Sequence, residues 1–443
     1  MDIKLSESFT YKKLLRFTLP SIVMMIFTSI YGVVDGFFVS NFVGKTPFAA
    51  VNFIMPFLMI LGAIGFMFGT GGSALVSKTM GEGDPEKAKR IFSLLIYVST
   101  ACAVVIAVVG IALLRPLASL LGAEGELLEN CVRYGRIILI ALAAYVLQFE
   151  FQSFFVTAEK PQLGLAFTVA AGVTNMVLDA LLVAVFPLGL EGAAAATAIS
   201  QAVGGIAPLV YFARPNKSLL RLTKTRFDGK ILLKTCTNGS SELMSNISMS
   251  LVGMLYNVQL MKYAGEDGVA AYGVLMYINM IFLAAFIGYS VGTAPVVGYH
   301  YGAQNHAELK SLLSKSVRII SVFAVCMFAL AEVLARPLAS IFVGYDAGLT
   351  ELTVRAFSIF SFAFLFAGFS IFGSSFFTAL NNGLISAAIS FLRTLVFQIA
   401  AVLILPLIFD IDGIWYSIVV AEVVSVIVTA IFIFAKRKKY GYM

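Results

Sequence analysis

The chain has 443 residues, of which 60% are hydrophobic and only 12% are charged, and its mean hydropathy is +0.93. Soluble domains are about 45–50% apolar and about 25% charged, so this chain lacks the polar side chains to cover a water-exposed surface. The composition excludes a soluble multidomain protein and predicts an integral membrane protein. The formal net charge of +7 does not indicate a nucleic-acid partner, because basic residues also gather in the cytoplasmic loops of membrane proteins.

Twelve apolar segments follow one another along the chain, and each is long enough to cross a hydrocarbon layer that requires roughly 20 residues per helix. They lie near residues 14–39, 48–76, 92–114, 133–157, 163–186, 192–213, 235–261, 269–298, 315–335, 354–380, 384–408 and 413–435. We expect helices, because backbone groups in lipid must be hydrogen-bonded within their own segment. The polar amino terminus predicts no removable signal peptide, so the first helix would direct insertion.

Lysine and arginine are distributed unevenly between the two sides of this arrangement. With the amino terminus inside, the inner segments hold 23 of these residues and the outer segments hold 7. Cytoplasmic loops carry an excess of positive charge. The asymmetry predicts a multi-pass protein of the cytoplasmic membrane with both termini in the cytoplasm.

The sequence contains an internal duplication at a shift of 221 residues. Arg115-Pro116-Leu117-Ala118-Ser119 recurs as Arg336-Pro337-Leu338-Ala339-Ser340, and further pairs at the same shift include Gly81 with Gly302 and Thr157-Ala158 with Thr378-Ala379. An even number of spans per repeat gives two lobes of the same orientation. We therefore predict an N-terminal lobe over 1–213, a cytoplasmic linker over 214–234 and a C-terminal lobe with a basic tail over 235–443. One chain would supply both lobes and function as a monomer.

Several ionisable side chains lie inside the predicted spans, where a charge costs at least about 2.5–3.5 kcal/mol. In the N-terminal lobe these are Asp35 in the first span and Asp179 in the fifth, with Asn175 one helical turn earlier on the same face. Thr197 lies in the sixth span and Tyr134 near the start of the fourth. Two carboxylates with amide and hydroxyl oxygens form a candidate site for a proton or for a hard cation such as Na⁺. A purely structural role for the two aspartates is the alternative.

Other polar residues of the spans have less certain roles. Glu150 lies in the middle of the fourth span, Glu242 near the start of the seventh, and Arg393 in the eleventh. Arg393 would either balance a carboxylate of its lobe or reach the cytoplasmic face. Glu332 and Glu422 would lie close to a membrane face. The histidines, His300 and His306, are expected to face water, and no motif of a metalloenzyme or of nucleophilic catalysis is present. We therefore expect neither an enzyme nor a bound cofactor.

The order and spacing of several segments resemble the multidrug and toxic compound extrusion (MATE) family over essentially the whole chain. They are LPSIVMMIFTSIYGVVDGFFVSNFVG, SKTMGEGDPEKAKR, FFVTAEKPQLG, NMVLDALLV and GLEGAAAATAIS. The resemblance implies an all-α membrane fold of two pseudo-symmetric six-helix lobes around a V-shaped cleft. It also implies export of organic, often cationic or amphiphilic, compounds in exchange for H⁺ or Na⁺.

The resemblance also implies functions for individual residues. The family's cation site corresponds to Asp35, Asn175, Asp179 and Thr197, with Tyr134 nearby, and these residues would couple H⁺ or hold Na⁺. Its substrate residues correspond to Glu242 and to either Glu150 or Gln152, with Arg393 as a further cleft candidate. A carboxylate that some relatives have in the tenth span is missing from 354–380.

The leading hypothesis is a bacterial inner-membrane antiporter that exports drugs by alternating access. The alternative is a flippase for lipid-linked oligosaccharide from the same broad superfamily, which would need basic residues for a pyrophosphate headgroup. Arg393 is the single basic residue placed well inside a predicted span.

Overall fold

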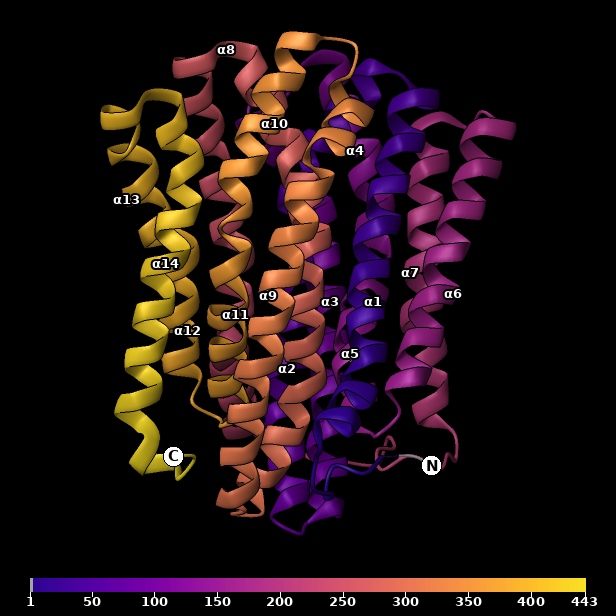
Figure 1. Cartoon of the computed structure of the whole chain (residues 1–443). Helices are drawn as coiled ribbons and strands as arrows, with labels where there is room; N and C mark the ends of the chain where they lie inside the picture. Colours follow the sequence, from indigo (N-terminus) through magenta and orange to yellow (C-terminus); the bar gives the residue numbers. More distant parts are fainter. Residues whose placement is uncertain (1–2) are drawn as a thin grey trace.

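The computed structural model describes residues 3–443, apart from the side chains of residues 40, 45 and 48. Its helices are α1 (Tyr11–Phe38), α2 (Lys45–Gly81), α3 (Pro85–Leu120), α4 (Gly125–Ile140), α5 (Leu142–Thr157), α6 (Pro161–Asp179), α7 (Gly189–Ala213), α8 (Gly229–Gly302), α9 (His306–Val343), α10 (Ala347–Ser361), α11 (Phe364–Ala379), α12 (Gly383–Phe391), α13 (Phe397–Ile404) and α14 (Pro406–Tyr440). Three π-helical segments extend or join them: η1 (Val39–Val43), η2 (Ala180–Val185) and η3 (Leu392–Val396). Figure 1 shows the helices running side by side along one direction.

Twelve membrane crossings account for these helices. Within the described residues, nine helices are long and apolar enough to cross a membrane, and two further crossings are bent pairs, α4 with α5 at 54° and α10 with α11 at 50°. The long helix α8 supplies two crossings, because Gly265 interrupts it with a φ of 64° and a ψ of −151°. At 1.5 Å per residue, an unbroken α8 would extend far beyond a bilayer. The predicted all-α fold of twelve spans in two lobes is confirmed.

The backbone repeats its unusual conformations at the interval found in the sequence. Positive φ angles occur at Gly44, Gly83 and Gly189, and again 221 residues later at Gly265, Gln304 and Asp410. The N-caps of the third helix in each lobe are also equivalent. Asp84 accepts a hydrogen bond from the Lys87 N–H at 2.9 Å, and Asn305 accepts one from the Glu308 N–H at 3.1 Å. The two lobes are therefore built to one plan of turns and caps.

Both described ends of the chain lie at the same end of the helix bundle (Figure 1). At this end one hydrophobic cluster includes buried residues of both lobes, such as Phe92 and Phe154 of the first and Leu309 and Phe377 of the second. Toward the other end each lobe has its own cluster, around Tyr134 in the first and Trp415 in the second. The lobes are thus packed together at the end that carries the termini and have separate cores at the opposite end.

Glycines permit the close approach of the lobes at the terminal end. A Cβ atom on Gly81 of α2 would lie 2.0 Å from the Tyr299 carbonyl oxygen, and one on Gly302 of α8 would lie 2.0 Å from the Lys78 carbonyl oxygen. These two glycines are equivalent in the duplication. Equivalent positions of the lobes therefore pack reciprocally against each other's backbone, as in small-residue interfaces of membrane helices.

We expect Gly302→Ala to push α2 and α8 apart, because the added methyl group overlaps a backbone oxygen that cannot move alone. Overpacking of this kind costs about 1–3 kcal/mol, so the apparent melting temperature in detergent should fall. Gly253→Ala is the matched control in the same helix, since its Cβ would meet no atom within 4 Å. Equal melting temperatures for the two variants would contradict this account of the interface.

Candidate functional site

Asp35 and Asp179 lie against each other within the N-terminal lobe. Asp35 belongs to α1, and its carboxylate interacts with Asp179 and Asn175 of α6 and with Thr197 of α7. The Thr197 hydroxyl donates to Asp35 Oδ1 at 3.4 Å. The structure thus brings together the four polar residues that the sequence assigned to one cation site.

Both helices that carry the carboxylates change to π-helical winding close to these residues. The segment η2 begins directly after Asp179, and η1 begins one turn after Asp35. A π-helical turn leaves the regular pattern of backbone hydrogen bonds, and such turns occur frequently at functional sites.

The site contains acceptor oxygens that no donor satisfies. The Asp179 side chain is fully buried and Asn175 is 2% exposed. Neither carboxylate oxygen of Asp179 has a hydrogen-bond partner, nor has Asn175 Oδ1. Buried carboxylates without donors are costly, and two ionised ones in contact also repel each other. A proton or a small cation at this place would remove the repulsion and use the free oxygens.

Two tyrosines border this cluster. Tyr134 of α4 is buried beside Thr197 and the two carboxylates, and its hydroxyl lies 3.8 Å from Met55 Sδ. The Tyr31 hydroxyl accepts a hydrogen bond from Gln148 Nε2 of α5 at 3.3 Å. Sequence reasoning missed Tyr31 and Gln148, although Tyr31 precedes Asp35 by four residues and so shares its helix face.

Glu150 and Gln152 of α5 are buried inside the N-terminal lobe. Glu150 is fully buried, and its Oε2 accepts a hydrogen bond from Ser99 Oγ of α3 at 2.6 Å. It follows Gln148 by two residues and so lies on another side of α5. Gln152 is 3% exposed, and neither of its side-chain polar atoms has a partner. No contact joins either residue to the acidic pair.

The C-terminal lobe contains a buried ion pair instead of an acidic pair. Arg393 of η3 binds Glu422 of α14 through three N–O contacts of 2.8–3.0 Å, and the two side chains are 14% and 6% exposed. Arg393 therefore balances a carboxylate of its own lobe, and Glu422 lies inside the bundle rather than at a membrane face. Glu242 of α8 is half-buried and lies near Arg393. Glu332 of α9 accepts a hydrogen bond from Ser361.

One of the two histidines departs from the sequence expectation. His300 is buried, not water-facing, because the amino-terminal residues cover the end of α8 and its Nε2 lies 3.3 Å from the Glu7 carbonyl oxygen. His306 is exposed, as predicted, and its Nδ1 lies 3.1 Å from the Tyr440 carbonyl oxygen. Among residues 3–443, no group of three or more His, Cys, Asp or Glu side chains is arranged to hold a metal ion.

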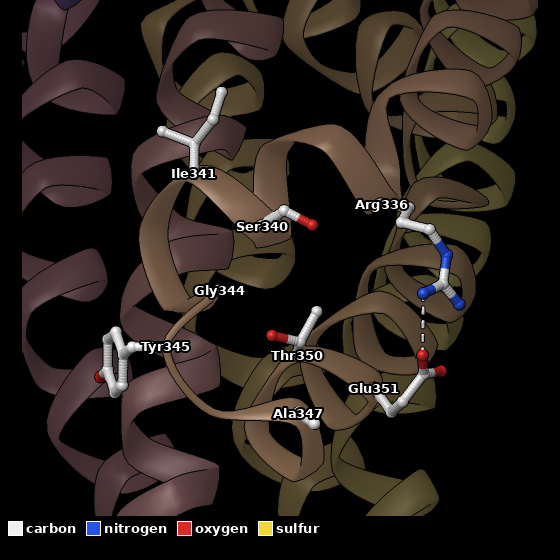
Figure 2. Close-up of a pocket in the computed structure, with 8 residues that line it drawn as sticks. All are labelled: Arg336, Ser340, Ile341, Gly344, Tyr345, Ala347, Thr350 and Glu351. Carbon is white, nitrogen blue, oxygen red and sulfur yellow. Dashed lines mark ion pairs between the residues drawn. The ribbon is translucent and has the colours of Figure 1, made fainter.

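A surface pocket of about 460 Å³ lies between α9 and α10, at the end opposite the termini (Figures 1 and 2). On its wall Arg336 pairs with Glu351 at 2.8 Å, and both side chains are largely exposed. The N-terminal lobe has a corresponding pair, Arg115 with Glu129 at 2.7 Å. The same kind of ion pair thus joins the third and fourth crossings in each lobe. We therefore interpret it as a structural contact and not as part of a binding site.

Two lobes of six crossings, with a buried acidic cluster in one of them, define a class of two-lobed helical membrane transporters. The family model MatE matches residues 20–181 and again residues 243–404. The chain belongs to the MATE family of transporters.

Curated relatives cover nearly the whole chain. It is 24% identical to the "Multidrug export protein MepA" of Staphylococcus saprophyticus over 441 residues, which is 98% of this chain and 95% of the relative. It is 25% identical to the protein of the same name from Staphylococcus haemolyticus, with the same two shares covered.

Solved structures show the same fold. A structure described as "Outward-facing conformation of a multidrug resistance MATE family transporter of the MOP superfamily" superimposes with a TM-score of 0.92 at 23% identity over 98% of both chains. A Pyrococcus furiosus transporter, described with "reverse polarity of binding pocket", gives a TM-score of 0.91 at 23% identity over 98% of this chain and 97% of that chain.

We expect Glu422→Met to destabilise the C-terminal lobe by about 3–5 kcal/mol, because it removes the carboxylate that binds the buried Arg393 guanidinium through three contacts. The double variant Arg393→Met with Glu422→Met should recover most of this loss, since apolar residues of similar volume replace buried pairs well. Thermal unfolding of both variants measures the effect.

Glu351→Met is the control for this pair, because it breaks an exposed ion pair worth about 0–1 kcal/mol. If Glu422→Met and Glu351→Met lower the melting temperature equally, the buried pair does not have the role assigned to it.

Proposed function

We propose that the protein is a secondary active exporter that exchanges H⁺ or Na⁺ for organic cationic or amphiphilic compounds by alternating access. The observation that carries this proposal is the contact of Asp35 with Asp179 in a buried site whose remaining oxygens have no donors. The names of the staphylococcal relatives support multidrug export. We place the protein in a bacterial inner membrane and take one chain as the functional unit.

Exchange requires that the coupling ion and the substrate favour different arrangements of the lobes. A ligand that binds both arrangements with equal affinity does not change their relative populations. In this structure the lobes share one hydrophobic cluster at the terminal end and have separate clusters at the opposite end. This is typical of an arrangement that is closed at the terminal end. An ion at Asp35 and Asp179 would remove their repulsion and allow α1 and α6 to pack differently. Substrate would then leave as the lobes change position.

Glu242 is the residue we favour for contact with a cationic substrate. Arg393 lies near it, but the guanidinium is already bound by Glu422 through three contacts. The group of three therefore has one carboxylate more than it has cations, and Glu242 remains partly exposed. Glu150 and Gln152 are less suited to this role, because both are buried away from the surface.

The flippase alternative receives less support. A pyrophosphate headgroup needs free cationic groups, and Arg393 is occupied by Glu422. For the membrane orientation we propose that the end with both termini faces the cytoplasm. The excess of lysine and arginine in its loops supports this orientation.

We expect Asp35→Asn and Asp179→Asn to leave the protein folded and to abolish export driven by an ion gradient, because each removes one exchangeable charge. Ethidium efflux from proteoliposomes, with proton and sodium gradients imposed separately, measures the effect. Glu332→Gln serves as a control carboxylate outside the site. Gradient-driven efflux that persists in the double variant would refute the assignment of these two aspartates.

Thr197→Val distinguishes the two coupling ions. The change removes one neutral oxygen ligand and keeps the size of the side chain. For sodium coupling we expect the Na⁺ concentration for half-maximal efflux to rise roughly tenfold, which corresponds to the loss of about 1.4 kcal/mol of binding. For proton coupling the midpoint of the pH profile should move by less than one unit, because both carboxylates remain.

A further inference from the structure

The segment before α1 crosses the boundary between the lobes. Residues 3–10, which we call the arm, lie at the end of the helix bundle that carries both termini (Figure 1). Leu5 and Phe9 of the arm are buried in the one hydrophobic cluster that both lobes share. The arm is therefore packed between the lobes and is not a free tail.

On the N-terminal lobe the arm is held by the loop between α5 and α6. The Leu5 N–H donates to Glu159 Oε1 at 2.6 Å. Glu159 has a positive φ of 60° in this tight loop. Burial raises the pKa of the Glu159 carboxyl, while the Leu5 N–H lowers it. This carboxyl group has thus given up much of its contact with water to hold the arm.

On the C-terminal lobe the arm is held by the beginning of α9 and the end of α8. The Phe9 N–H donates to Glu308 Oε1 at 2.8 Å, and Glu308 is only 8% exposed. The Glu7 carbonyl oxygen lies 3.3 Å from His300 Nε2, and the Phe9 carbonyl oxygen accepts a hydrogen bond from Lys315. Hydrogen bonds to charged groups of this kind are stronger than those between neutral groups.

These contacts of the arm are not required to cap the amino-terminal end of helix α1. Its N-cap is Thr10, whose hydroxyl accepts a hydrogen bond from the Lys13 N–H at 3.3 Å. Only three residues lie between Leu5 and Phe9, and an extended chain spans at most about 3.3–3.6 Å per residue. If the lobes moved apart at this end, the short arm would lose its contact with Glu159 or with Glu308.

We propose that the arm is a latch that holds the two lobes together at the terminal end, with Glu159 and Glu308 as its two anchoring residues. Release of one anchor precedes opening of the transporter on that side. This last step rests on the alternating access of the proposed function, whereas the latch itself does not.

The test measures how often the seam between the lobes opens at the terminal end. A single reporter cysteine replaces Ser77, which is buried against Gly298 of the other lobe, in a full-length chain whose native cysteines are replaced by serine. We expect Glu159→Ala with Glu308→Ala to accelerate labelling of the reporter by a water-soluble maleimide roughly tenfold. That corresponds to about 1.4 kcal/mol of latch energy.

Two matched double variants separate the latch from a general effect of lost charge. Glu159→Gln with Glu308→Gln keeps a neutral acceptor oxygen at each place and should label more slowly than the alanine variant, at a rate between that variant and the parent. Glu82→Ala with Glu86→Ala removes two exposed carboxylates at the same end and should also label at the parent rate. A second reporter cysteine at Ala103, in the core of the N-terminal lobe, should stay unlabelled in every variant.

The latch is overturned if the alanine variant labels no faster than the Glu82/Glu86 control, or if the glutamine variant labels as fast as the alanine variant. Faster labelling at Ala103 also overturns it, because that result indicates unfolding rather than separation of the lobes. Labelling requires no transport, so failure of the latch and failure of the proposed exchange activity give different results.

Discussion

Two carboxylates in contact inside an apolar helix bundle impose the main constraint on this structure. Asp35 and Asp179 come from helices far apart in the chain, and the surroundings provide fewer donors than their oxygens require. In a medium of low polarity such a pair is stable only when a positive charge compensates it. This constraint is the basis for our proposal that the N-terminal lobe binds a proton or a cation from outside the chain.

The C-terminal lobe also contains a buried carboxylate, but its charge is compensated differently. Its Glu422 is compensated within the chain by Arg393, which binds it through three contacts in the π-helical segment η3. A covalently attached cation cannot be exchanged, so this lobe keeps its charge balance as the surroundings change. The two halves of the duplication thus differ: the C-terminal lobe contains a fixed counter-charge, whereas the acidic pair of the N-terminal lobe has none within the described chain.

The duplicated backbone explains how two such different lobes still fit together. Positive φ angles recur at the same interval as the sequence repeat, and equivalent glycines, Gly81 and Gly302, pack reciprocally at the terminal end. The close approach of α2 and α8 depends on these small residues and not on the charges. The seam between the lobes and the acidic cluster of the N-terminal lobe are therefore separate features of the structure.

Composition, apolar segment length and the repeat were enough to determine the class of the fold, because lipid admits only helices or closed barrels and the duplication requires two similar lobes. The sequence also predicted that Asp35, Asn175, Asp179 and Thr197 lie together, because polar groups inside apolar spans are costly unless they have partners. Only the tertiary structure decided the partners of the other residues: Arg393 binds Glu422, Ser99 binds Glu150, and the arm buries His300. Such partners lie on helices separated by tens or hundreds of residues, and the periodicity of one helix does not determine which neighbour faces it.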